Sequence, residues 1–219
     1  MHILQIKRQK NKDSQPYVQQ IPYDGQASTI AQALQEINET IADPIGWQCS
    51  CMVRKCGACA MRINGQPRLA CASFLRDYKK TITLEPLGKF PVIRDLVVDR
   101  GVISKSLKNM KIWLEEEARP NAWTFELRYQ SARCLLCGCC LEICPNYGGN
   151  NVFAGAAAAV NAYRIFAESR KTTGHYQDLK KAYKKYYYET CGQSLSCNDI
   201  CPAKLPVTEL LACANQFGR

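Results

Sequence analysis

The chain has 219 residues, of which 47% are apolar and 22% charged, and its formal net charge is +10. This apolar content sustains a packed core in one domain or two small ones, which excludes disordered, collagen-like and low-complexity classes. The charge excess is divided evenly between residues 1–100 and 101–219, whereas nucleic-acid binding proteins concentrate basic residues on one face, so no nucleic-acid partner is expected.

No stretch of the sequence predicts a membrane span or an export signal. The longest apolar run, residues 152–160, consists mostly of Ala and Gly and is far shorter than the roughly 20 residues that a bilayer span needs. Residues 1–12 become polar and basic after Ile6 and contain no signal-like apolar segment. We therefore expect the protein to remain in the compartment where it is made.

The first half of the chain is predicted to be a small α/β unit. Ser28 or Thr29 can cap a helix whose apolar residues recur with helical spacing until Asp43-Pro44 ends it. Asn64-Gly65 is the residue pair typical of a tight β-hairpin turn. The expected strands are His2–Arg8, Tyr17–Ile21, Ala60–Ile63, Gln66–Ala70 and Thr81–Leu84.

The second half is predicted to be helical, with a domain boundary near residues 90–105. A basic and aromatic run, Lys180–Tyr188, places Tyr183 and Tyr187 on one helix face and Lys180 and Lys184 on another, which favours a half-buried helix over a lipid-binding or nucleic-acid site. The expected helices are Leu96–Val102, Ser106–Glu117, Cys134–Cys144, Phe153–Arg170, Tyr176–Tyr188 and Val207–Ala214.

Fourteen cysteines are far more than packing requires. Disulfides are rare in a reducing cytosol, so dense cysteines in a chain without an export signal favour metal binding. The first group has the spacing C-x4-C-x2-C, followed by a single cysteine beyond the predicted hairpin, which is the plant-type ferredoxin pattern for a 2Fe–2S cluster. A zinc site does not require this loop spacing or a distant fourth cysteine, so zinc is disfavoured. The predicted ligands are Cys51, Cys56, Cys59 and Cys71.

Two further cysteine motifs, at residues 134–145 and 191–202, both end in Cys-Pro. In two-cluster ferredoxins the first three cysteines of a motif hold one cluster and the fourth ligates the other. This crosswise rule predicts a 4Fe–4S cluster on four cysteines and leaves three for another cluster. The 4Fe–4S ligands are Cys134, Cys137, Cys140 and Cys201, and the remaining three are Cys144, Cys191 and Cys197.

Ser194 stands where a complete second motif would have a cysteine. Three thiolates are the natural complement of a 3Fe–4S cluster, and a serine hydroxyl gives up its proton far less readily than a thiol, so a 3Fe–4S cluster is predicted. Cys140 and Cys144 are separated by at most about 14 Å of chain, which is close enough for electrons to pass between their clusters. Cys49, Cys139 and Cys213 are left as structural residues.

These motifs together resemble one family, the iron–sulfur subunits of succinate dehydrogenases and fumarate reductases. The resemblance covers nearly the whole chain and includes Gly57, the hairpin leading to Leu69-Ala70-Cys71, the segment Phe90–Asp99 and both Cys-Pro motifs. It implies an α+β fold, with a ferredoxin-like β-grasp domain at residues 1–98 that carries 2Fe–2S, and an all-helical two-cluster ferredoxin domain at 99–219.

The resemblance also implies an electron-transfer subunit with no catalytic residues of its own. Electrons would pass between an FAD-containing flavoprotein subunit, where fumarate and succinate interconvert, and quinone or quinol at a membrane-anchor subunit of cytochrome b type, with haem b as a possible further cofactor. The order would be flavin, 2Fe–2S, 4Fe–4S, 3Fe–4S, then quinone. The subunit would be peripheral, held by the anchor at the cytoplasmic face of the plasma (inner) membrane.

Two sequence features bear on the direction of the reaction. Ubiquinone-using succinate dehydrogenases commonly have a tryptophan shortly after the second-motif Cys-Pro, whereas the run at residues 144–150 has none. Met52 replaces the arginine usual after the first cluster cysteine. The missing tryptophan favours quinol:fumarate reduction over succinate oxidation, whereas Met52, with Arg54 nearby, is expected to alter the local potential. Two other hypotheses remain open: a free-standing soluble electron carrier, and the iron–sulfur subunit of a glycolate or glycerol-phosphate type oxidoreductase, which Ser194 disfavours.

Overall fold

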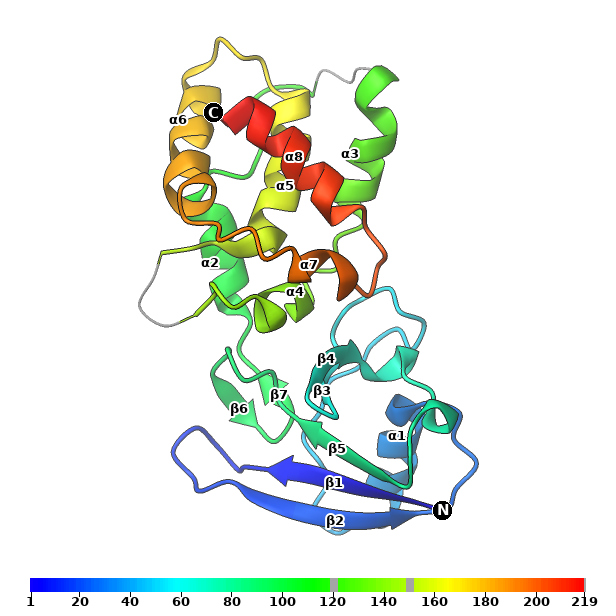
Figure 1. Ribbon diagram of the computed structural model, residues 1–219. Helices are drawn as coiled ribbons and strands as arrows, with labels where there is room; N and C mark the ends of the chain where they lie inside the picture. The colour runs from blue at the N-terminus through cyan, green and yellow to red at the C-terminus, as the bar shows by residue number, and fades with distance from the viewer. Residues whose placement is uncertain (119–121, 149–151, 219) are drawn as a thin grey trace. The chain divides into compact units, whose positions relative to one another are not determined.

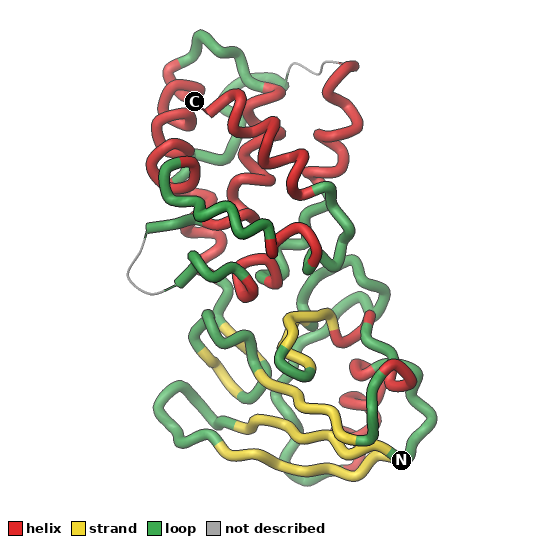
Figure 2. Tube along the Cα trace, in the orientation of Figure 1, coloured by secondary structure: helices red, strands yellow, loops and turns green. Residues whose placement is uncertain are grey.

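The computed structural model describes residues 1–118, 122–148 and 152–218. The chain forms two compact units, Met1–Arg100 and Gly101–Arg219. Figure 2 shows the strands in the first unit, and helices making up most of the regular structure of the second. The fold is therefore α+β, with a ferredoxin-like sheet unit followed by a helical unit.

The first unit is built on a five-stranded mixed sheet (Figure 1). Its strand order is β2-β1-β5-β3-β4, in which β1 runs parallel to β5 and antiparallel to β2, while β3 is antiparallel to both β4 and β5. The turn between β3 and β4 is Asn64-Gly65, as predicted, and both residues have positive φ. The strands are β1 His2–Arg8, β2 Tyr17–Tyr23, β3 Ala60–Ile63, β4 Gln66–Leu69 and β5 Thr81–Glu85.

Helix α1 (Ile30–Thr40) supplies much of the apolar core of this unit. Its residues Ile30 and Leu34 are fully buried, as are Leu4 of β1 and Ile82 of β5. The helix begins at a capping box, in which the Thr29 hydroxyl accepts from the Gln32 N–H and the Gln32 side chain accepts from the Thr29 N–H. Of the two predicted caps, Thr29 is therefore the one used.

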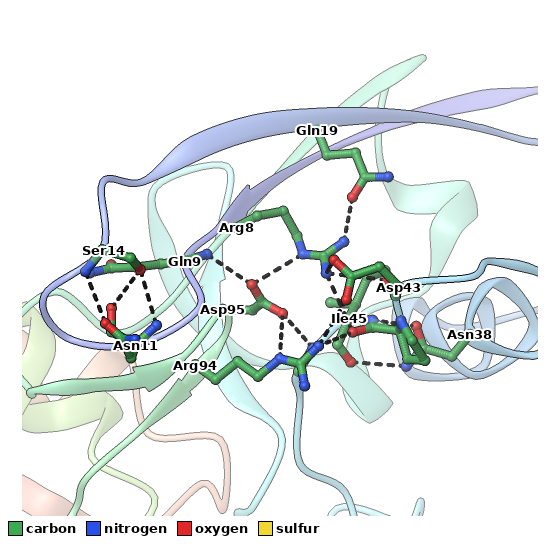
Figure 3. A network of polar contacts seen from close by, with 12 residues as sticks. Arg8, Gln9, Asn11, Ser14, Gln19, Asn38, Asp43, Ile45, Arg94 and Asp95 are labelled. Carbon is green, nitrogen blue, oxygen red and sulfur yellow. Dashed lines mark hydrogen bonds and ion pairs between the residues drawn. The ribbon is translucent and has the colours of Figure 1, made fainter.

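A small hairpin of β6 (Val92–Arg94) and β7 (Val97–Val98) stands where the sequence predicts the start of a helix. That prediction is wrong, and Asp95 gives the physical reason. Asp95 has φ +48° and makes the turn, while its carboxylate accepts hydrogen bonds from the N–H groups of Gln9 (2.8 Å) and Gly46 (2.7 Å) (Figure 3). These bonds to distant backbone hold the segment extended.

The second unit is arranged around α5 (Gly155–Glu168), most of whose residues are buried. Small side chains at 156–159 let neighbouring helices approach closely, and α5 packs against α2, α3 and α8. Its other helices are α2 Gly101–Asn109, α3 Phe125–Ala132, α4 Cys139–Ile143, α6 Gly174–Tyr183, α7 Ser196–Asp199 and α8 Val207–Gly218.

Several predicted helix bounds differ from those of the structure. The helix expected over Ser106–Glu117 ends at Asn109, and His175 Nε2 lies 2.7 Å from the Trp113 carbonyl, which holds the following segment by a tertiary contact. Helix α6 continues into a π-helical turn, Lys184–Tyr188. In this turn Tyr187 is buried and Lys184 is exposed, as expected for the half-buried helix predicted for Lys180–Tyr188. No helix among the described residues is long and apolar enough to cross a bilayer.

Candidate iron–sulfur sites

The first three cysteines of the first group lie in the loop between α1 and β3, and Cys71 follows β4. The Cys51 sulfur accepts hydrogen bonds from three backbone N–H groups, which belong to Val53 (3.4 Å), Lys55 (3.2 Å) and Cys56 (3.3 Å). The loop can curl round this sulfur because Met52, Arg54 and Gly57 have positive φ. The N–H groups lower the pKa of Cys51 to about 7, so this thiol is prepared to act as a thiolate ligand.

Cys59 and Cys71 form the buried side of the same group. Their sulfurs are 3.4 Å apart, and the Ala70 N–H donates to the Cys59 carbonyl at 3.1 Å, which holds the two chain segments together. Burial raises the pKa of the Cys59 thiol, and the adjacent Cys71 sulfur also opposes its ionisation. The Ala58 N–H donates to the Cys56 sulfur at 3.4 Å. All four cysteines predicted to bind 2Fe–2S therefore border one loop.

Cys49 also belongs to this group, although the sequence analysis left it as structural. Its sulfur lies 3.2 Å from the Met52 sulfur and interacts with the Cys59 thiol. Burial raises the pKa of Cys49, and the nearby Cys71 and Cys56 sulfurs add to this. The Cys-x-Cys spacing with Cys51 was the one sequence signal for this position.

The second group lines a cavity between α4, α5 and the segment before α8. Burial raises the pKa of both Cys134 and Cys140, and nearby sulfurs raise both further. The buried Asn161 side chain lowers the pKa of Cys134, and no sequence signal pointed to this amide. The cavity wall contains the four cysteines predicted for 4Fe–4S, Cys134, Cys137, Cys140 and Cys201, and is otherwise mostly apolar, with Leu136, Ala157, Val160 and Leu205.

The third group lines a separate cavity of about 210 Å³. It contains the three remaining predicted ligands, Cys144, Cys191 and Cys197, together with Ser194, Tyr187 and Phe153. Burial raises the pKa of Cys197 to about 11, and the Cys144 sulfur adds to the shift. The Tyr187 and Phe153 rings stack with their centroids 5.6 Å apart at this cavity, and burial together with the nearby Cys191 sulfur raises the pKa of Tyr187.

Comparison with known proteins agrees with this arrangement. A family model described as a 2Fe-2S iron-sulfur cluster binding domain matches residues 3–105. The chain is 32% identical to the succinate dehydrogenase iron-sulfur subunit of Bacillus subtilis, over 96% of this chain and 90% of the relative. It is 30% identical to the fumarate reductase iron-sulfur subunit of Haemophilus influenzae, over 92% of this chain and 86% of the relative. The chain belongs to this family of iron–sulfur subunits.

Family membership makes the chain an electron-transfer subunit of an oxidoreductase complex with a 2Fe–2S domain. A chain of the Mycobacterium smegmatis Sdh1 complex in the apo form has the same fold, with a TM-score of 0.81 at 19% identity, covering 99% of this chain and 95% of that one. The relatives carry both succinate dehydrogenase and fumarate reductase names, and another from Coxiella burnetii is a succinate dehydrogenase subunit 32% identical over 88% of this chain.

The donor sets suit the iron–sulfur clusters of this family. Among the described residues, no three His, Cys, Asp or Glu side chains converge as they do on a single metal ion. A cluster has a different requirement, because its terminal thiolates bind separate iron atoms. In both helical cavities the sulfurs oppose one another's ionisation, and a cationic iron–sulfide core offsets this repulsion. The residues present therefore fit such groups.

The other two unassigned cysteines have different surroundings. Cys139 is fully buried at the start of α4, and the neighbouring Cys137 thiol, followed by burial, raises its pKa, so it lies beside the second group. Cys213 lies on α8, where burial raises its pKa and Glu209 adds to the shift.

Proposed function

We propose that this subunit relays electrons through 2Fe–2S, 4Fe–4S and 3Fe–4S clusters between an FAD-containing flavoprotein subunit and quinol or quinone at a membrane anchor of cytochrome b type. The observation that carries the proposal is a pair of cavities whose walls contain cysteines only four positions apart, one on α4 and one at its C-terminal end. Cys140 borders one cavity and Cys144 the other. At the rise of an α-helix, four residues span only about 6 Å, so the two centres would lie well within electron-transfer distance.

The proposed ligands are those of the three groups. Cys51, Cys56, Cys59 and Cys71 hold 2Fe–2S, Cys134, Cys137, Cys140 and Cys201 hold 4Fe–4S, and Cys144, Cys191 and Cys197 hold 3Fe–4S. When bound, each cluster accepts and releases one electron at a time. The protein holds the thiolates, donates backbone N–H groups to them, as at Cys51, and excludes water with apolar walls.

The third centre is proposed as 3Fe–4S because Ser194 is in the wall of a cavity that has only three cysteines. A cluster with four irons needs a fourth terminal ligand, and the exposed Ser194 hydroxyl gives up its proton far less readily than a thiol does. Without a fourth ligand, this centre would hold one iron fewer than the proposed 4Fe–4S centre.

For the physiological direction, we favour quinol:fumarate reduction. The segment after Cys144-Pro145 is Asn146-Tyr147-Gly148, and no tryptophan follows; Gly149 and Asn150 lie outside the described residues. In this proposal the anchor supplies the quinone site, is the subunit that would carry any haem b, and keeps this subunit peripheral at the cytoplasmic face of the plasma membrane.

Purification of the native complex tests the proposal. We expect the subunit to leave the membrane together with an FAD protein and to contain about nine irons, as 2Fe, 4Fe and 3Fe centres require. We expect the complex to reduce fumarate with low-potential quinols faster than it oxidises succinate. If the purified complex contained zinc in place of iron, the proposed electron relay would be overturned. A faster succinate reaction would support the alternative direction, and a subunit that purifies alone would support a free-standing carrier.

A further inference from the structure

Arg100 makes three hydrogen bonds to the loop of the first cysteine group. Its Nη1 donates to the Gly57 carbonyl at 2.7 Å, and its Nη2 donates to the Ala58 carbonyl at 3.0 Å and to the Gln48 side-chain oxygen at 3.4 Å. Gly57 and Ala58 are the two residues between Cys56 and Cys59. One guanidinium therefore connects the segment before Cys51 with the segment between Cys56 and Cys59.

These bonds fix the orientation of two peptide planes. In a trans peptide the carbonyl and the N–H of the same unit point in opposite directions. The Gly57 carbonyl faces Arg100, so the N–H of the same peptide, which belongs to Ala58, faces the other way and donates to the Cys56 sulfur at 3.4 Å. The Ala58 carbonyl bond orients the N–H of Cys59 away from Arg100 in the same manner.

We propose that Arg100 is a positioning residue that raises the reduction potential of the 2Fe–2S centre, by holding the Ala58 N–H on the Cys56 sulfur and by placing a fixed positive charge behind the loop. This inference rests on the proposed ligand set of that centre. Reduction adds one electron, and therefore one negative charge, to the centre and its thiolates. Hydrogen bonds to sulfur and a nearby cation both favour the more negative form.

A purely structural role for Arg100 predicts a different result. If the guanidinium only holds the loop in place, its loss lowers the stability of the unit or the cluster content. The reduction potential of each 2Fe–2S centre that is still bound then stays unchanged. Arg54 separates the effect of charge from that of orientation. It lies in the same loop, with its guanidinium 5.4 Å from the Phe74 ring centroid, and Arg54→Gln removes the same charge without touching the Gly57 and Ala58 carbonyls.

The test is an EPR redox titration of the 2Fe–2S signal in the purified complex, with iron content measured in parallel. For Arg100→Gln we expect the ratio of reduced to oxidised centre at a fixed potential to fall about tenfold, equivalent to about 59 mV for one electron. Arg54→Gln should lower it by much less. Arg100→Lys keeps the charge but cannot bridge both carbonyls, and should fall between Arg100→Gln and the unaltered protein.

The proposal would be overturned by an Arg100→Gln complex that retains its 2Fe–2S centre and has the reduction potential of the unaltered protein. It would also be overturned if the potential of Arg100→Gln fell no further than that of Arg54→Gln. If Arg100→Gln does not retain the centre, Arg100→Lys decides, and an unshifted potential in that variant would overturn it equally. Failure of the underlying function is distinguishable, because the unaltered complex would then show no 2Fe–2S signal at all.

Discussion

Arg8 and Asp95 form a buried ion pair, with Arg8 Nε 3.1 Å from Asp95 Oδ1 and side chains only 2% and 3% exposed (Figure 3). Arg8 ends β1 and Asp95 turns the hairpin that follows the sheet. Asp43 lies 3.0 Å from the same guanidinium and Gln19 is also hydrogen-bonded to it. The pair therefore ties the segment that precedes the first cysteine group to the sheet.

Replacement of Asp95 by Asn should destabilise the first unit by about 3 kcal/mol, because it leaves the buried Arg8 charge with only the exposed Asp43 as a counterion. We expect a lower urea midpoint for the loss of 2Fe–2S absorbance in the complex. Arg94→Gln is the matched control, since that side chain is 46% exposed in its pairs with Asp43 and Asp95, and it should cost less than about 1 kcal/mol. Equal midpoints for the two variants would contradict the assignment of Asp95 as the centre of this network.

Thr29→Ala should lower the stability of the first unit by about 1 kcal/mol, because it removes the side-chain cap of α1. Ser28→Ala is the control. The Ser28 N–H donates to the Gln32 side chain, and this backbone bond survives the substitution, so the stability should change little. The measurement is again the urea midpoint, and a larger effect at Ser28 than at Thr29 would show that the cap lies one residue earlier.

Gly155→Ala should disturb both clusters of the helical unit. Gly155 has φ +76°, and a Cβ there would lie 2.2 Å from Leu141 Cδ2. Leu141 is buried on α4 between Cys140 and Cys144, so its side chain or the helix that both groups share must shift. We expect a cost of about 2–5 kcal/mol, the sum of left-handed strain and overpacking, together with loss of iron.

The control for this substitution is Gly174→Ala at the first residue of α6, where an added Cβ meets nothing within 4 Å. Its iron content and thermal midpoint should stay within error of the unaltered complex. A Gly155→Ala complex with full iron and an unchanged midpoint would mean that α4 can shift without cost to the clusters.

Ser194→Cys should convert the third centre toward 4Fe–4S, because it supplies a thiol in a cavity that already contains Cys144, Cys191 and Cys197. The 3Fe-type EPR signal of the oxidised complex should fall, the iron content should rise by about one, and the potential should decrease. Ser194→Ala separates this effect from a direct role of the hydroxyl and should leave the signal unchanged. Loss of the 3Fe-type signal in the Ala variant would show that Ser194 is itself a ligand.

Local patterns predicted the elements that are stabilised by their own side chains. Helix α1 was predicted because Ile30, Leu34 and Ile37 repeat at helical spacing and a cap precedes them. The Asn64-Gly65 turn was predicted because its positive φ values favour these residue types. The helix predicted from Leu96 was wrong because apolar residues in a short run do not distinguish a strand from a helix. The segment is held extended by hydrogen bonds that the Asp95 carboxylate accepts from the Gln9 and Gly46 N–H groups, which lie 86 and 49 positions away in the sequence.

The sequence by itself predicts which residues bind iron, because ligand number and spacing are properties of the covalent chain, and three thiols in one short loop with a fourth beyond a hairpin can reach one cluster in few ways. Only the tertiary structure decided what surrounds them. Arg100 reaches carbonyls 42 and 43 residues away, and Asn161 and Tyr187 come to their cysteines through helix packing. No spacing rule encodes such contacts, because they depend on which helices and strands become neighbours once the apolar faces are buried.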